Sequence, residues 1–139
     1  MPKVIATNRR ARFDYEILDT IEAGLVLTGQ EIKGIRAGLV QLQGSYARAF
    51  GTELFWLGGH IKVAEGDPQR TRKLLLNRQE IDELRRALQE KRLTVVPLSI
   101  YLKNGRAKLE LGLGRHRKKS DKRELIKKRE TDLELKRLA

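Results

Sequence analysis

Apolar and polar residues alternate in several short stretches, and the clearest alternation lies in residues 93–113, around Asn104-Gly105. Asn-Gly is the residue pair that a type I′ turn prefers, so this segment predicts a β-hairpin. A two-residue loop also sets the register and pairs apolar residues on one face: Leu102 with Ala107, Ile100 with Leu109, and Leu98 with Leu111. Because Pro97 has no N–H to donate, we expect its nitrogen to face away from the partner strand or a bulge to form there.

Two further hairpins are expected nearer the N-terminus. Residues 15–21 and 25–27 flank Ala23-Gly24, and residues 46–50 and 54–57 flank Gly51-Thr52. Glycine at the first position of the second turn suits type II′ geometry. Residues 1–12 are expected to form a mobile basic arm, and residues 62–72 a loop.

Two helices are predicted between the strands. Thr28 with Glu31, and Asn77 with Glu80, have the spacing of a capping box, which marks a helix N-terminus. Many short antiparallel strands with two small helices predict a mainly β, α+β fold. We expect a partly open barrel of the oligonucleotide/oligosaccharide-binding type.

The 139 residues suit one domain, and the net charge of +12 indicates contact with nucleic acid. The end of the chain concentrates this charge, since residues 112–139 hold 11 Lys or Arg residues against 5 Asp or Glu. Such a segment buries too little apolar surface to order itself. We therefore expect an RNA-binding barrel in residues 1–112 and a basic tail in residues 113–139 that is disordered in the free protein.

Few residues suit catalysis or a cofactor. The chain has no cysteine and two histidines, His60 and His116, far apart in sequence. Metal-ligand spacings and phosphate-binding glycine loops are missing from the sequence. With no apolar run long enough for a membrane span or a signal peptide, we expect a cytoplasmic protein with no membrane partner and no cofactor. An enzyme of RNA, for which His60 would be the residue to test, is the weakest hypothesis.

Basic residues instead form clusters that could bind phosphates. The clusters comprise Asn8, Arg9, Arg10 and Arg12; Arg70, Arg72 and Lys73; and Arg115, Arg117 and Lys118. The chain has seven aromatic residues, of which Tyr15, Tyr46, Trp56 and Tyr101 fall on predicted strands. Packing in the core is the favoured interpretation for them, which favours recognition of a folded RNA over stacking with single strands. A resident ribosomal or RNA-scaffold protein is the second hypothesis.

Motifs along almost the whole chain resemble the SsrA-binding protein family. They include Asn8-Arg-Arg-Ala-Arg12, Glu22-Ala-Gly-Leu-Val-Leu27, Gly29-Gln-Glu-Ile-Lys33, Arg72-Lys-Leu-Leu-Leu76 and Asp121-Lys-Arg123. The resemblance implies a non-catalytic adaptor of trans-translation. Such an adaptor binds the tRNA-like domain of transfer-messenger RNA as a monomer and delivers it to stalled ribosomes. Its tail then occupies the empty mRNA channel and folds as a helix at the decoding centre.

The resemblance also implies roles for individual residues. Carried over by position, the RNA-binding residues are Asn8, Glu22, Leu75 and Lys108, and the tail residues are Asp121, Lys122, Arg123, Lys127 and Leu138. The pattern of residues 74–76 alone would instead place Leu75 in the core. Two departures from the family stand out, because Phe13 replaces a histidine and Ser120 replaces an aromatic residue or histidine.

Overall fold

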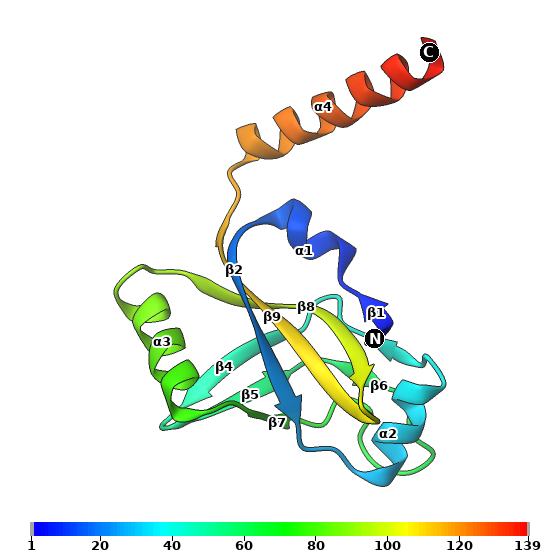
Figure 1. The fold of residues 1–139 in the computed structure, drawn as a ribbon, viewed down its shortest axis with the longest axis vertical. Helices are drawn as coiled ribbons and strands as arrows, with labels where there is room; N and C mark the ends of the chain where they lie inside the picture. Colours follow the sequence, from blue (N-terminus) through cyan, green and yellow to red (C-terminus); the bar gives the residue numbers. More distant parts are fainter. Residues whose placement is uncertain (1, 139) are drawn as a thin grey trace.

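An antiparallel sheet of seven strands curls into an open barrel, with small helices at its margins (Figure 1). The structure is a computed structural model and describes residues 2–138. The sheet has the order β1-β8-β9-β2-β7-β5-β4, and β3 pairs with β6 separately. The strands are β1 (Lys3–Thr7), β2 (Tyr15–Leu25), β3 (Val40–Gln41), β4 (Tyr46–Phe50), β5 (Glu53–Leu57), β6 (His60–Ile61), β7 (Arg72–Leu75), β8 (Thr94–Lys103) and β9 (Arg106–His116). The helices are α1 (Arg9–Asp14), α2 (Gly29–Arg36), α3 (Arg78–Gln89) and α4 (Lys119–Leu138).

The hairpin of β8 and β9 confirms the turn expected at Asn104-Gly105. Both residues have positive φ, 52° and 75°, as a type I′ turn requires. Leu102 lies opposite Ala107 and Ile100 opposite Leu109, as expected. The expected pair of Leu98 with Leu111 is wrong, because the register shifts between Pro97 and Ser99 and Pro97 lies opposite Leu111. The bulge expected at Pro97 is therefore confirmed, and it moves Leu98 out of register.

The hairpin of β4 and β5 is also confirmed, with Gly51 at φ +61° in its turn. The hairpin expected at Ala23-Gly24 is wrong, because residues 15–25 form the single strand β2. Gly24 serves close packing and not a turn: an added Cβ would lie 3.3 Å from the Leu75 Cβ. Ala23 is fully buried in the core, which fixes the face that β2 turns inward.

Both predicted capping boxes are present. The side chain of Thr28 accepts from the Glu31 N–H and Asn77 accepts from the Glu80 N–H, and each glutamate accepts in return from the cap backbone. The mobile arm expected in residues 1–12 is wrong. β1 pairs with β8, and α1 packs through the buried Ala11 against Val96 and Leu98.

The last strand joins the barrel to the tail. β9 runs through His116, and α4 begins at Lys119. In Figure 1, α4 extends away from the barrel on the side where α1 lies. The disorder expected for the basic tail in the free protein stays a prediction. No helix among residues 2–138 is long and apolar enough to cross a membrane.

A buried ion pair ties the barrel wall to α2. Arg72 is fully buried; its Nε donates to Glu31 Oε2 over 2.5 Å, and its other nitrogens donate to the carbonyls of Gly59 and Pro68. Burial alone would raise the pKa of Glu31. The hydrogen bonds from Arg70, the Thr28 backbone and Arg72 outweigh that effect and lower the pKa from 4.5 to about 2.

We predict that Glu31→Gln destabilises the protein at pH 7 by roughly 3–5 kcal/mol, because the buried Arg72 charge loses its partner. The folded-state pKa lies below the ordinary value, so the glutamate's contribution is complete above pH 4.5 and is lost as the pH falls toward 2. Urea unfolding of both proteins between pH 7 and pH 2 measures this. The difference in the free energy of unfolding between the two proteins should shrink as the pH falls from 4.5 to 2. A difference that does not change with pH would contradict the prediction.

Candidate RNA interface

Three residues far apart in sequence meet on the outer face of the barrel. Lys108 of β9 lies opposite Gly24 of β2, and Gly24 lies opposite Leu75 of β7. Directly paired residues of antiparallel strands turn to the same face, so Lys108 and Leu75 flank Gly24. Glu22 lies two residues before Gly24 and shares this face. We call Glu22, Leu75 and Lys108, with the residues around them, the β2–β7–β9 face (Figure 1).

Glu22 is held as an ionised acceptor. The Tyr101 hydroxyl donates a hydrogen bond to Glu22 Oε2, and Lys103 Nζ lies 3.5 Å from the same oxygen. The hydrogen bond from Tyr101 is the main cause that lowers the pKa of Glu22, and Lys103 adds to it. Burial and the neighbouring Glu22 raise the pKa of Tyr101, which keeps its proton on the phenol. The exposed carboxylate can accept from a ribose hydroxyl or a base amino group.

Leu75 corrects the expectation of a core residue. Within β7 the side chains alternate, so Leu74 is buried while Leu75 is 51% exposed. Leu75 lines a hollow of about 200 Å³ with Gly24, Leu27, Ile32 and Lys108. An apolar side chain at the edge of a polar hollow suits contact with the flat side of a sugar or base.

The turn between β8 and β9 adds cations that the sequence analysis missed. Lys103 and Arg106 are exposed and lie opposite each other at this turn. They flank the face that carries Lys108. The sequence signal for them was weak, because they do not form a run of charges. Their position beside the Asn104-Gly105 turn was the only indication.

The basic cluster at residues 70–73 divides on folding. Arg72 was expected to bind RNA, and the structure contradicts this, because its fully buried guanidinium bonds to Glu31. Arg70 remains 41% exposed while bonding to Glu31 over 2.7 Å. Lys73 is exposed on β7 and lies 3.3 Å from Glu53. Two cations of the cluster thus remain accessible to phosphate.

A second basic region surrounds α1. Arg9, Arg10 and Arg12 are exposed, with Arg10 3.4 Å from Asp14 and Arg12 3.8 Å from Glu110. Asn8 is only 8% exposed, and its Nδ2 donates to the Pro97 carbonyl over 3.0 Å. Asn8 therefore anchors the start of α1, and direct contact with RNA stays a prediction for it.

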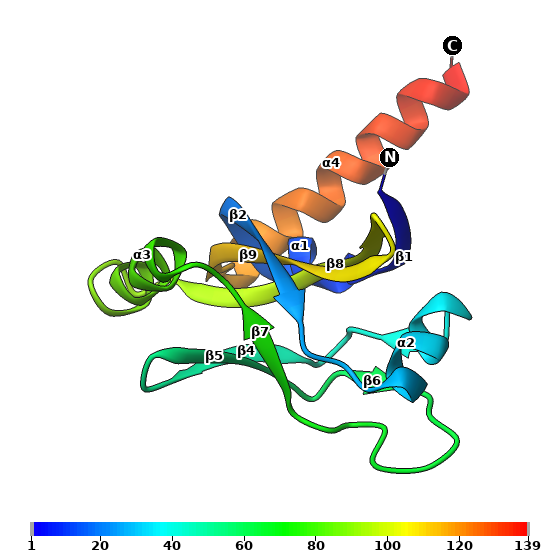
Figure 2. The same ribbon diagram turned by 60° about the horizontal axis from the view of Figure 1, so that its bottom comes forward.

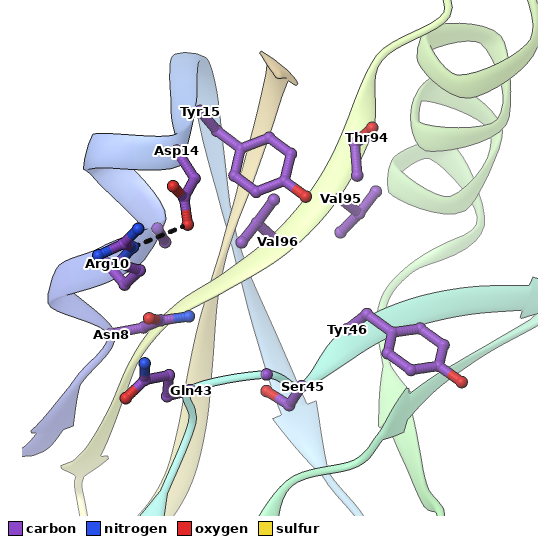
Figure 3. Close-up of a pocket in the computed structure, with 12 residues that line it drawn as sticks. Asn8, Arg10, Asp14, Tyr15, Gln43, Ser45, Tyr46, Thr94, Val95 and Val96 are labelled. Atoms are coloured by element: carbon purple, nitrogen blue, oxygen red, sulfur yellow. Dashed lines mark hydrogen bonds and ion pairs between the residues drawn. The ribbon is translucent and has the colours of Figure 1, made fainter. Parts of the chain in front are cut away.

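Beside α1 lies a pocket of about 410 Å³, between β8 and the segment that leads into β4 (Figure 3). Tyr15 and Tyr46 lie on opposite sides of it, and Asn8, Arg10 and Gln43 line one end. The pocket marks the open seam of the barrel, because β4 and β8 are not neighbours in the sheet order.

The root of the tail contacts α1 through Asp14 and Phe13. Lys122 Nζ lies 3.1 Å from Asp14, and the cationic groups of Arg10, Lys122 and Arg129 lie 5.1–5.9 Å from the Phe13 ring centre. Burial would raise the pKa of Asp14, but Lys122 and Arg10 lower it below the ordinary value. Phe13, which departs from the family pattern, thus offers its ring to cations where a histidine would offer hydrogen bonds.

The remaining tail residues are placed by backbone or by exposure. Arg115, Lys118, Arg123 and Lys127 are exposed, and Arg117 is half-buried. The side chains of Asp121 and Leu138 lie outside the described residues, so the structure says nothing of their contacts. The tail cations do not join the β2–β7–β9 face, because β9 leaves the barrel at the end where α1 lies.

We predict that Tyr101→Phe raises the pKa of Glu22 toward its ordinary value, because the main stabilising hydrogen bond is removed. Carboxyl NMR titration measures the change. Lys103→Ala should raise the pKa by a smaller amount. An unchanged pKa in Tyr101→Phe would show that this hydrogen bond does not form in solution.

The chain is similar to known proteins over most of its length. The family model described as SmpB protein matches residues 5–139. The SsrA-binding protein of Chloroflexus aggregans is 50% identical over 141 residues, which cover 96% of this chain and 89% of the relative. The SsrA-binding protein of Streptococcus thermophilus is 47% identical over 148 residues, which cover 99% and 96%.

A solved structure described as "tmRNA-SmpB: a journey to the center of the bacterial ribosome" contains a similar chain, at a TM-score of 0.66 and 46% identity. The match covers 82% of this chain and 85% of that one. Family model, sequence relatives and solved structure therefore agree, each over most of the chain. The chain belongs to the SmpB protein family.

Proposed function

We propose that this protein is an RNA-binding adaptor of trans-translation. It binds the tRNA-like domain of transfer-messenger RNA and delivers it to stalled ribosomes in the cytoplasm. The observation that carries the proposal is the meeting of Glu22, Leu75 and Lys108 on one face, assembled from three separate strands. The names of the relatives, which bind SsrA RNA, support the same RNA as ligand.

The chemistry of the face suits a folded RNA. Lys108, Lys103 and Arg106 supply positive charge for phosphates, while Glu22 supplies an acceptor that a phosphate could not approach. An anionic acceptor among cations selects a site where a 2′-hydroxyl or base donor lies between phosphates. The shape of the folded RNA, which fixes where its phosphates and its hydrogen-bond donors lie, would therefore decide binding.

The proposed role is non-catalytic and needs no cofactor. Among the side chains that the structure describes, no group of three or more His, Asp or Glu residues could hold a metal ion. His116, one of the two histidines, packs its ring against Tyr15 with 5.0 Å between ring centres. His116 therefore packs at the end of the pairing between β2 and β9.

Barrel and tail divide the work in this proposal. The barrel binds the RNA, and the tail, with Asp121, Lys122, Arg123, Lys127 and Leu138, enters the mRNA channel of the ribosome. The exposed cations of α4 would neutralise phosphates of ribosomal RNA. One adaptor molecule serves one RNA.

We predict that Lys108→Ala weakens binding to the isolated tRNA-like domain about tenfold, because a phosphate contact is lost. The slope of log affinity against log salt should fall by about one. Fluorescence anisotropy from 50 to 200 mM salt measures both. Lys62→Ala, which removes an exposed lysine near α2, is the matched control. Equal losses in the two variants would contradict a specific face.

We predict that removing residues 119–139 abolishes tagging of stalled peptides and leaves binding of the tRNA-like domain within about threefold. The cut lies after His116, because β9 contributes residues through that position to the barrel. In vitro tagging and anisotropy measure the two activities. Parallel loss of both would argue against a division of labour between barrel and tail.

A further inference from the structure

The hairpin of β4 and β5 exposes an unusual share of the aromatic residues. The chain has seven, and Tyr46, Phe50 and Phe55 lie on the outer face of this hairpin. Tyr46 is 47% exposed and Phe50 is 51% exposed. The sequence analysis favoured core packing for strand aromatics. That is correct for Trp56, which is fully buried in the core, and wrong for Tyr46; Tyr101 is buried outside the core clusters, where it bonds to Glu22.

Alternation along β4 produces this surface. Ala47 and Ala49 turn inward and pack against the core, so Tyr46, Arg48 and Phe50 turn outward. We call Tyr46, Arg48, Phe50 and Phe55 the β4 strip. Alternate residues of a strand are about 6.6–6.8 Å apart, which is twice the ~3.4 Å rise per nucleotide of a stacked strand. Successive outward side chains of β4 therefore have the spacing to admit a base between them.

The contacts within the strip suit a stack of bases. The Arg48 guanidinium lies 5.3 Å from the Phe50 ring centre, and Phe50 and Phe55 meet edge to face with centres 5.8 Å apart. An arginine beside an aromatic ring offers a planar cation and a π-face together. Proteins that bind single strands combine these two features.

The strip is open to a partner. β4 ends the hydrogen-bonded order of the seven-stranded sheet, so no strand among residues 2–138 pairs with its outer edge in that sheet. Tyr46, the first residue of the strip, also lines the pocket beside α1, across from Tyr15, and Arg10 lines the far end of that pocket (Figure 3). An RNA strand that continued past Tyr46 would reach the exposed guanidinium of Arg10.

Charge decides between the two partners that an aromatic edge strand could take. A second copy of the chain would bring two molecules of net charge +12 together, with Arg48 near its own equivalent. The same positive charges would instead attract a polyanion such as RNA. Lys73, opposite Phe55 in the sheet, lies at the inner border of the strip, 3.3 Å from Glu53, which is opposite Phe50.

We propose that the β4 strip binds single-stranded RNA by stacking unpaired bases on Phe50 and Tyr46. Figure 2 shows β4 and β5 across the barrel from β8 and β9, so the strip is separate from Lys108. Both surfaces can therefore bind RNA at the same time: the β2–β7–β9 face binds a folded domain, and the strip binds an unpaired segment. The proposal extends the proposed function, and it does not depend on which folded RNA that face binds.

The test measures binding of a fluorescein-labelled 12-mer oligouridine to the full-length protein. Phe50→Ala and Tyr46→Ala should each weaken it roughly 5- to 150-fold. Phe50→Tyr keeps a ring and should bind like the unchanged protein. Leu39→Ala, which truncates an apolar side chain of 47% exposure beyond α2, is the matched control and should change nothing.

Binding of the tRNA-like domain by the same variants separates this proposal from the proposed function. Phe50→Ala should retain this binding, and Lys108→Ala should weaken it about tenfold. Unchanged oligouridine binding in both alanine variants would overturn the strip as an RNA site. Equal loss of both RNAs in Phe50→Ala would also overturn it, as would a dimer that dissociates in Phe50→Ala without any effect on RNA.

Discussion

The antiparallel pairing of β2 with β9 is the constraint on which the rest of the structure depends. The register runs from Tyr15 opposite His116 to Gly24 opposite Lys108, with one irregularity between Ile17 and Asp19. One end of this pairing sets the β2–β7–β9 face, because Gly24 brings Lys108 and Leu75 to its two sides. The other end sets the tail, because β9 passes into α4 beside α1.

Small residues make this pairing possible. An added Cβ at Gly114 would lie 2.4 Å from the Glu16 carbonyl oxygen, and one at Gly112 would lie 2.9 Å from Leu98. Larger side chains there would push β2 and β8 away from β9. Gly24 likewise allows β2 to approach Leu75 of β7 closely. Close approach of strands, and not turn geometry, explains these glycines.

Local chemistry made part of the fold predictable from sequence. Asn104-Gly105 supplied its own turn, and Thr28 and Asn77 supplied their helix caps, because each feature depends on residues within a few positions. The resemblance to a family supplied Glu22, Leu75 and Lys108. The periodic pattern alone did not, since a three-leucine run hides which leucine turns outward.

Features that depend on distant partners could not be predicted. Arg72 looked like a phosphate ligand because its partner, Glu31, lies 41 residues away. Gly24 looked like a turn because the strands that crowd it come from β7 and β9. Tyr46 looked like a core residue because the sequence does not show that Ala47 and Ala49 are the β4 residues that turn to the core. In each case the error came from tertiary contacts that override a local pattern.

The fold thus has two surfaces of different chemistry on one small barrel, and we propose RNA as the ligand of both. The β2–β7–β9 face combines cations with an ionised acceptor and an exposed leucine, while the β4 strip combines rings with an arginine. In this proposal charge would supply affinity at both surfaces, and the arrangement of acceptors and rings would distinguish folded from unpaired RNA.

The most direct measurement of the central claim is an amide NMR titration of the full-length protein with the isolated tRNA-like domain of transfer-messenger RNA. The account predicts the largest shift changes at Glu22, Gly24, Leu75 and Lys108, on three strands that only the fold brings together. Changes confined to α1 and α4, with these four amides unmoved, would contradict it.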